Sequence, residues 1–270
     1  MDAGELLKRY AAGDRDFQKA NLVGADLSGA NLSKANFTEA DLSEANLVDA
    51  DLRGTDLSRS TLIGANLRGA SLRNTKLVKA NLYEANLSGA ILGGADLTQV
   101  NLREAVLKGA DLSDTNLSDA NLNGAFLTET NLMEADLSRA SLRLANLGRV
   151  NLKQANLMEA NLEGANLTSV NGDGALLQGA NLSRANLGGA LLRGVNLSDA
   201  NLGSAKLSEA NLAGANLHAV NLYRAKLSWS NLSGTDLTEA VLLGANLGRA
   251  NLQGANLTGA TMPDGKIYEG

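Results

Sequence analysis

One apolar position recurs every five residues along most of the chain, from Leu22 to Met262. Leucine occupies this position everywhere except at Phe37, Gly172 and Met262. A small residue, mostly Ala, stands two places before it, Asn or Asp stands directly before it, and polar residues or Gly follow it. A period of five matches neither the helical period of about 3.6 residues nor the two-residue alternation of a strand.

A backbone that turns through about a quarter circle per five-residue repeat explains this period, because four repeats then close a coil with Leu and Ala inside. Neighbouring coils would pair edge to edge like parallel strands. The pattern therefore predicts an all-β solenoid of about 12 coils, forming one domain over residues 20–264. Gly at the fifth position should supply the positive φ of a tight turn. Five successive coils carry it there: Gly174, Gly194, Gly214, Gly234 and Gly254.

Residues 20 apart become neighbours in such a coil, so the second positions of the repeat form columns of Asn and Asp. Stacked amides can pair along a ladder, whereas stacked carboxylates repel one another. No Asp of these columns follows another Asp at this spacing, and Lys76 falls between Asp56 and Asp96. Outer charges also alternate in sign, as Glu39 does with Arg59. The charges therefore support the 20-residue coil.

The N-terminal residues 1–19 lie largely outside the repeat and predict a short capping helix and lead-in. Asp2 and Glu5 have the spacing of a capping box at a helix start, and Gly13 should end the helix. Its apolar side would consist of Leu6, Leu7, Tyr10 and Ala11. A helix this short is marginal alone, so that side is expected to cover the open end of the solenoid.

The C-terminal residues 265–270 are expected to cap the other end, where a bare strand edge would otherwise be exposed. Pro263, the only proline, precedes an Asp-Gly turn. The segment after the turn should stay in the repeat register, with Ile267 at a central position.

The repeats Ala25-Asp26-Leu27-Ser28-Gly29 and Ala30-Asn31-Leu32-Ser33-Lys34, with their continuation, resemble the pentapeptide-repeat proteins. This resemblance implies that the solenoid is a right-handed quadrilateral β-helix. The leader 5–13 and the ending 261–265 are similar to the end segments of family members that are abundant in cyanobacteria. The resemblance implies no particular activity, since most members have none assigned.

Composition limits the classes of function. Basic and acidic residues number 24 and 29, for a net charge of -5 without a block of one sign, which argues against general nucleic-acid binding. With no Cys, one His and dispersed carboxylates, no nucleophile has an identifiable base, and we expect no enzyme, no cofactor and no metal site. No stretch has the apolar length of a signal peptide or membrane span. We therefore expect a cytoplasmic protein with no membrane partner.

Gly172 interrupts a Leu column, which removes one apolar rung from the core. Two interpretations are open. In the first, the chain bulges or kinks there, and Val170 with nearby Leu residues fills part of the hole. In the second, the sequence Asn171-Gly172-Asp173-Gly174 opens a ligand or calcium site, although it lacks the usual cluster of oxygen ligands.

Apolar residues replace Asn at a few outward positions. Val106 and Phe126 should be vertical neighbours in one column, with Ile91 on the adjoining face. These residues are interpreted either as drift at tolerant surface positions or as an apolar patch for a partner.

A second cluster lies late in the chain and contains the only Trp. Arg249 should lie directly above Trp229, at stacking distance for a cation-π contact. Because Trp, Tyr and Arg are the usual anchors of interfaces, this face is a candidate partner-binding surface, although scatter plus a terminal cap would also explain it. Its members in the expected register are Lys206, Lys226, Trp229, Arg249, Lys266 and Tyr268.

Two function classes follow. The first is a rigid, non-catalytic scaffold that binds another protein, itself a monomer or weak homodimer. The second is an acidic DNA mimic, since some members of the resembled family protect DNA gyrase in this way. Mimicry needs a sustained field of one sign, whereas here Asn outnumbers Asp in the ladders and bases interrupt the acidic columns.

Overall fold

The structure is a computed structural model that describes residues 1–269. Its contacts divide the chain into two compact units, Met1–Asp136 and Leu137–Gly270, called here the N-terminal and C-terminal units. Apart from one helix, α1 (Ala3–Ala11), both units are built from the five-residue repeat. No helix within residues 1–269 has the length and apolarity that crossing a membrane requires.

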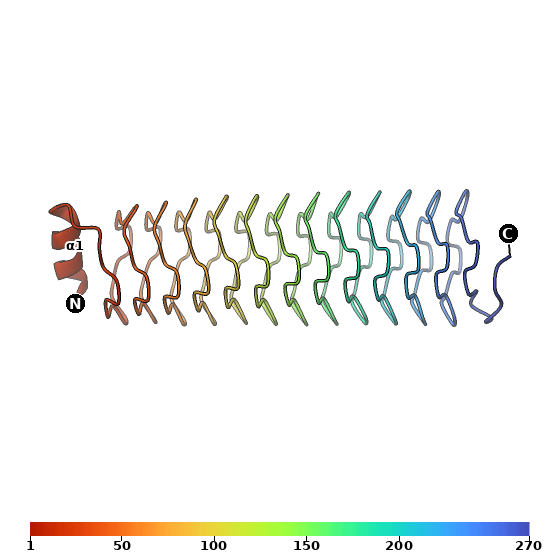
Figure 1. The fold of residues 1–270 in the computed structure, drawn as a ribbon, viewed down its shortest axis with the longest axis horizontal. Coiled ribbons are helices and arrows are strands. Elements are labelled where there is room, and N and C mark those ends of the chain that lie inside the picture. Colours follow the sequence, from red (N-terminus) through yellow and green to blue (C-terminus); the bar gives the residue numbers. More distant parts are fainter. Residues whose placement is uncertain (270) are drawn as a thin grey trace. The chain divides into compact units, whose positions relative to one another are not determined.

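The repeat forms a coil within each unit, and Figure 1 shows its successive turns side by side. Parallel bridges join second-position residues that are 20 apart, such as Asp16 and Asn36 in the N-terminal unit and Asn161 and Asn181 in the C-terminal unit. Amides of central residues donate to carbonyls of the next coil, as Leu22 does to Asp41 at 2.7 Å. Pairing within the described range takes the form of single-residue bridges, without longer strands. The predicted 20-residue coil is confirmed.

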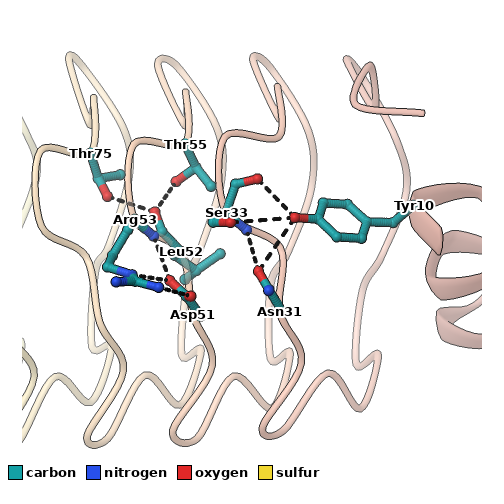
Figure 2. Close-up of polar contacts among 8 residues, drawn as sticks. All are labelled: Tyr10, Asn31, Ser33, Asp51, Leu52, Arg53, Thr55 and Thr75. Atoms are coloured by element: carbon teal, nitrogen blue, oxygen red, sulfur yellow. Dashed lines mark hydrogen bonds and ion pairs between the residues drawn. The ribbon is translucent and has the colours of Figure 1, made fainter. Parts of the chain in front are cut away.

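Leu and the small first-position residue fill the inside of the coil and are almost all fully buried. Where Thr or Ser replaces Ala, its hydroxyl finds a backbone acceptor: Thr55 and Thr75 both donate to the carbonyl of Leu52, at 2.7 and 2.9 Å (Figure 2). Each replacement therefore adds a polar atom to the core without leaving it unpaired. Apolar burial of this kind contributes about 1.5 to 3 kcal/mol per large side chain.

A tight turn forms each corner of the coil. The amide of Ala25 donates to the carbonyl of Leu22 at 3.0 Å, and the intervening Gly24 has a φ of +65°. The five glycines predicted to have positive φ all have it. Residues with side chains adopt the same conformation elsewhere, among them Lys34 at +59° and Trp229 at +64°. The corner therefore imposes a left-handed backbone whatever residue occupies it.

The predicted amide ladder is also present. Asn101 donates its side-chain amide to the Asn81 oxygen at 2.8 Å, and other pairs repeat this contact. The same type of oxygen accepts the backbone amide two residues later, as Asn86 does from Ser88 at 3.0 Å. Of the two carboxylates expected beside Lys76, Asp56 lies 3.9 Å away. Asn thus links neighbouring coils and also stabilises the turn that follows it.

Helix α1 covers the first coil of the N-terminal unit (Figure 1). The carboxylate of Asp2 caps it by accepting the Glu5 amide at 2.8 Å. Leu6 is fully buried, but Leu7 and Ala11 are exposed, so the predicted apolar side is wrong in these two residues. Tyr10 instead attaches the helix through its hydroxyl, which donates to the Ser33 carbonyl at 2.9 Å (Figure 2).

The end of the C-terminal unit departs from the expected register. Ile267 pairs antiparallel with Thr261, and the Tyr268 amide donates to the Ala260 carbonyl at 2.8 Å. The reversal follows from the turn after Pro263, where Gly265 has a φ of +89°. The segment therefore folds back on the last coil as a hairpin.

Candidate functional site

The Trp229 face is built on three successive coils of the C-terminal unit. Trp229 occupies a corner, and its amide donates to the Gly248 carbonyl at 3.0 Å. Because the backbone is fixed there, the indole points away from the core and is 58% exposed. The guanidinium carbon of Arg249 lies 4.4 Å from the ring centroid, so the predicted cation-π contact is confirmed.

Two lysines run beside this column. Lys206 and Lys226 are direct bridge partners, and both side chains are exposed. Neither forms an ion pair with any residue of the described chain. Like charges that face each other across neighbouring strands repel, so this stack is unfavourable in the isolated molecule. It is the one pair of equal charges that stacks in the second-position columns of residues 1–269.

Two residues predicted for this face lie elsewhere. The hairpin places Tyr268 beside Gly259, whose amide donates to the Tyr268 carbonyl at 2.8 Å, and places Lys266 beside Met262. Lys266 also lies 3.2 Å from the carboxylate of Asp264. The prediction that Lys266 and Tyr268 share the face of Trp229 is wrong, because it assumed that the repeat register continues through the final turn. The Trp229 face is therefore defined here as Lys206, Lys226, Trp229 and Arg249.

The apolar departures of the N-terminal unit divide into two sets. Val106 and Phe126 are bridge partners, and Phe126 is half exposed. Ile91 instead lies in another column, between Ser71 and Asp111. The structure thus brings Val106 and Phe126 together in one ladder and places Ile91 in a different one. Whether they bind a partner stays a prediction.

Gly172 does not bulge. It keeps its ladder contact, donating to the Leu191 carbonyl at 2.7 Å, and its turn contact, accepting from the Ala175 amide at 3.0 Å. The predicted bulge or kink is therefore wrong. The expected filling by a nearby Leu is confirmed, because Leu192 Cδ2 lies 3.0 Å from where a Cβ of residue 172 would stand.

The alternative cation site at Gly172 finds its carboxylate already engaged. Asp173 accepts the Arg193 backbone amide and Nε, each at 2.9 Å. Burial raises the pKa of Asp173, but the hydrogen bonds from Arg193 outweigh that effect and leave the pKa below its usual value. The Asp173 carboxylate thus forms an ion pair with Arg193, 20 positions later, and also accepts the backbone amide at the turn that contains Arg193.

One polar relay includes the only histidine. His218 Nδ1 lies 2.8 Å from the Thr238 hydroxyl, which donates to Asp236 at 2.7 Å. Backbone and side-chain hydrogen bonds from Thr238 lower the pKa of Asp236. Because the Thr238 hydroxyl donates its hydrogen to the Asp236 carboxylate, its oxygen is left to accept a hydrogen bond from His218 Nδ1. The imidazole in this arrangement does not take a proton from the hydroxyl. This order does not activate the hydroxyl as a nucleophile.

A polar hollow in the N-terminal unit escaped the sequence reasoning. It is lined by Ser33, Lys34, Arg53, Gly54, Arg73 and Asn74. The signal was present in the sequence, since Arg53 and Arg73 are 20 apart and Gly54 falls between Lys34 and Asn74 at the same spacing. We call this feature the Gly54 hollow.

Comparison with known proteins identifies the repeat. The family model described as pentapeptide repeats matches in eight copies, over residues 16–47, 45–82, 80–119, 110–149, 135–171, 155–194, 196–234 and 230–263. No curated protein sequence gives a significant match.

Solved structures give further similarities. The chain is similar to HetL, a pentapeptide repeat protein involved in heterocyst differentiation regulation from the cyanobacterium Nostoc, at 35% identity over 99% of this chain and 100% of that one, with a TM-score of 0.46. Rfr23 from the cyanobacterium Cyanothece is 32% identical over 41% of this chain and 86% of its own, with a TM-score of 0.33. QnrB1, a plasmid-mediated fluoroquinolone resistance protein, is 21% identical over 73% and 91%, with a TM-score of 0.32.

The eight matched segments leave little of residues 16–263 uncovered, and they share the five-residue period that builds both units. The chain therefore belongs to the pentapeptide-repeat family.

Proposed function

We propose that the protein is a non-catalytic scaffold that binds another protein through the Trp229 face. The observation that carries this proposal is the exposed indole of Trp229, held under the guanidinium of Arg249 at 4.4 Å. We also propose the finer architecture that the family resemblance implies, a right-handed quadrilateral coil with end caps at 1–19 and 265–270.

The Trp229 face has the properties of an interface anchor. Trp and Arg are enriched among binding hot spots, and Trp supplies a large, rigid contact area at low conformational-entropy cost. Here the corner fixes the tryptophan backbone and the arginine stacks on its ring, so little order has to be gained on binding. Between the tryptophan and lysine columns lie the small residues Ser208, Ser228 and Gly248, which leave space for a partner backbone.

The polar groups of the repeat support a non-catalytic role. Second-position oxygens accept the turn amide, and many serine hydroxyls bind the same oxygen, as Ser88 does at 2.7 Å from Asn86. These hydroxyls serve the turn, and the same holds where the acceptor is a carboxylate, as in the contacts of Ser43 with Asp41 at 2.6 Å and Ser113 with Asp111 at 2.8 Å. A stack of such turns within each unit offers rigid surface more readily than a reaction centre.

The proposal is tested by capture of partners from the native cell, with the wild type and with Trp229→Ala plus Arg249→Ala. A captured protein is then purified, and a segment of it that lacks Trp is titrated into the wild type. Tryptophan emission is followed during this titration. Because Trp229 is the only tryptophan, its emission reports directly on this face. We expect a shift in emission and loss of binding in the double variant.

A matched control uses Phe126→Asn, which restores the ladder residue in the N-terminal unit and leaves Trp229 intact. This variant should bind as the wild type does. Partners that bind the double variant and the wild type equally would remove the Trp229 face from consideration.

The alternative of an acidic DNA mimic is less well supported. Acidic side chains are partly neutralised, as Glu39 is by Lys19 and Arg59, each at 3.6 Å. The stacked lysines of the Trp229 face also oppose a continuous negative field. A gyrase supercoiling assay separates the two functions, since the scaffold proposal predicts unchanged supercoiling at excess protein.

A further inference from the structure

The Gly54 hollow is formed by a missing side chain. Lys34, Gly54 and Asn74 occupy the same corner column at intervals of 20, and Gly54 stands in the middle. A Cβ on Gly54 would meet only the Lys34 side chain, at 3.7 Å. Longer side chains above, below and beside this glycine therefore border an open hollow with a volume of about 580 Å³.

Cations dominate the lining. Lys34, Arg53 and Arg73 all contribute to it, and no acidic residue does. The remaining lining residues, Ser33 and Asn74, offer a hydroxyl and an amide. An anion in the hollow would therefore lie among cationic and neutral hydrogen-bonding side chains. The Arg73 guanidinium extends toward Gly93 of the next coil, where its Nη1 lies 3.2 Å from the position of a Cβ.

Arg53 is held rigidly at the edge of the hollow. Its Nε and Nη2 donate to the two carboxylate oxygens of Asp51 at 2.8 and 2.6 Å, as Figure 2 shows. The same carboxylate accepts the Arg53 backbone amide at 3.1 Å. Asp51 thus neutralises one of the three cations and orients its guanidinium.

The other two cations are weakly compensated. Arg73 reaches the Asp111 carboxylate only at 3.9 Å, and Lys34 forms no ion pair with a described residue. A doubly charged anion would balance the charges of Lys34 and Arg73, which lack a close carboxylate.

We propose that the Gly54 hollow binds the phosphate group of a small molecule. Guanidinium groups match the oxygen geometry of phosphate, and an ammonium group adds charge without directional demands. The volume lies within the range of small-molecule sites, so the hollow has room for more than a bare phosphate. This site lies on the N-terminal unit and does not depend on the function proposed for the Trp229 face.

The experiment titrates the full chain with inorganic pyrophosphate and, separately, with succinate, followed by calorimetry and amide chemical shifts. Gly54→Asn fills the hollow, and Asn tolerates a left-handed backbone, as Asn74 does in the same column. Arg73→Gln removes one uncompensated charge. We expect each variant to weaken pyrophosphate binding by about tenfold or more.

Matched controls separate a built site from general attraction. Gly89→Asn makes the same change at a glycine with positive φ and open surroundings, and Lys79→Gln removes one charge from another corner column. Both should bind pyrophosphate as the wild type does. Equal weakening in the controls, tighter binding of succinate, or no pyrophosphate binding at millimolar concentration would each overturn the proposal.

Discussion

Restoring the missing rung with Gly172→Leu tests how the core tolerates its one large defect. In the wild type Leu192 leans toward the vacant position, with Cδ2 at 3.0 Å from the site of a new Cβ. The hole still admits some solvent, since Leu177 is 5% exposed whereas its counterparts Leu157 and Leu197 are fully buried. The space is therefore only partly filled.

The expected gain follows from three contributions. Burying a Leu side chain contributes about 1.5 to 3 kcal/mol, and replacing Gly where φ permits adds about 0.4 to 1 kcal/mol through the unfolded state. Against this, Leu192 must withdraw, at a cost of about 0.5 to 1.5 kcal/mol if it enters a poorer rotamer. We expect Gly172→Leu to raise the free energy of unfolding by about 1 to 3 kcal/mol.

Urea unfolding followed by circular dichroism measures this change, and native-state hydrogen exchange at Gly172 and its neighbours shows whether it is local. A double-mutant cycle with Leu192→Ala gives the coupling between the two positions. Leu192→Ala should lower the free energy of unfolding more in the wild type than in Gly172→Leu, because in the wild type Leu192 also fills space at position 172. A loss of stability in Gly172→Leu with an unchanged urea slope would contradict this expectation, because it would mean that Leu192 already fills the space.

Three smaller changes probe the caps and charges. Leu6→Ala should lower the local stability of α1 by about 2 to 5 kcal/mol, seen as faster amide exchange in the helix, whereas Leu7→Ala at an exposed position should not. A side-chain hydrogen bond from Arg53 lowers the pKa of Asp51 in the folded protein. The ionised carboxylate therefore stabilises the fold above the pKa of unfolded Asp, near pH 4, and this stabilisation is lost as the pH falls through the pKa of the folded state. Asp51→Asn should therefore be less stable than the wild type at neutral pH, with the difference vanishing in acid; a constant difference would contradict this. Lys226→Asn should relieve repulsion from Lys206 and raise stability slightly at low salt, by about 0.2 to 1 kcal/mol, with no gain at high salt.

Much of the fold could be predicted because one short pattern repeats without a slip. The spacing of Leu fixes which side chains face inward, and the distribution of Asp fixes which residues are neighbours. The contact between Trp229 and Arg249 followed from the same rule and is present. Nearest-neighbour geometry is enough wherever each coil copies the one before it.

The errors lie where a local choice competes with the rule. After Pro263 the chain could continue the coil or reverse, and a turn at Gly265 decides for reversal, which moves Lys266 and Tyr268 to another place. At Gly172 the backbone hydrogen bonds outweigh the lost packing, so a side chain moves and the chain does not. The Gly54 hollow depends on the conformations of the long side chains around this glycine, which the sequence alone does not specify.

The left-handed corners have a consequence for how such a surface can change. A non-glycine side chain in this conformation costs about 1 to 2 kcal/mol relative to a right-handed one, a cost that arises from the Cβ atom and is least for Asn and Asp. Exchanging one non-glycine corner residue for another therefore alters stability little while the backbone path stays the same. Corner side chains such as Trp229 and Lys34 therefore occupy a regular grid of positions, at which single substitutions change the surface chemistry without changing the backbone. Selection for recognition can act on that grid almost independently of selection for folding.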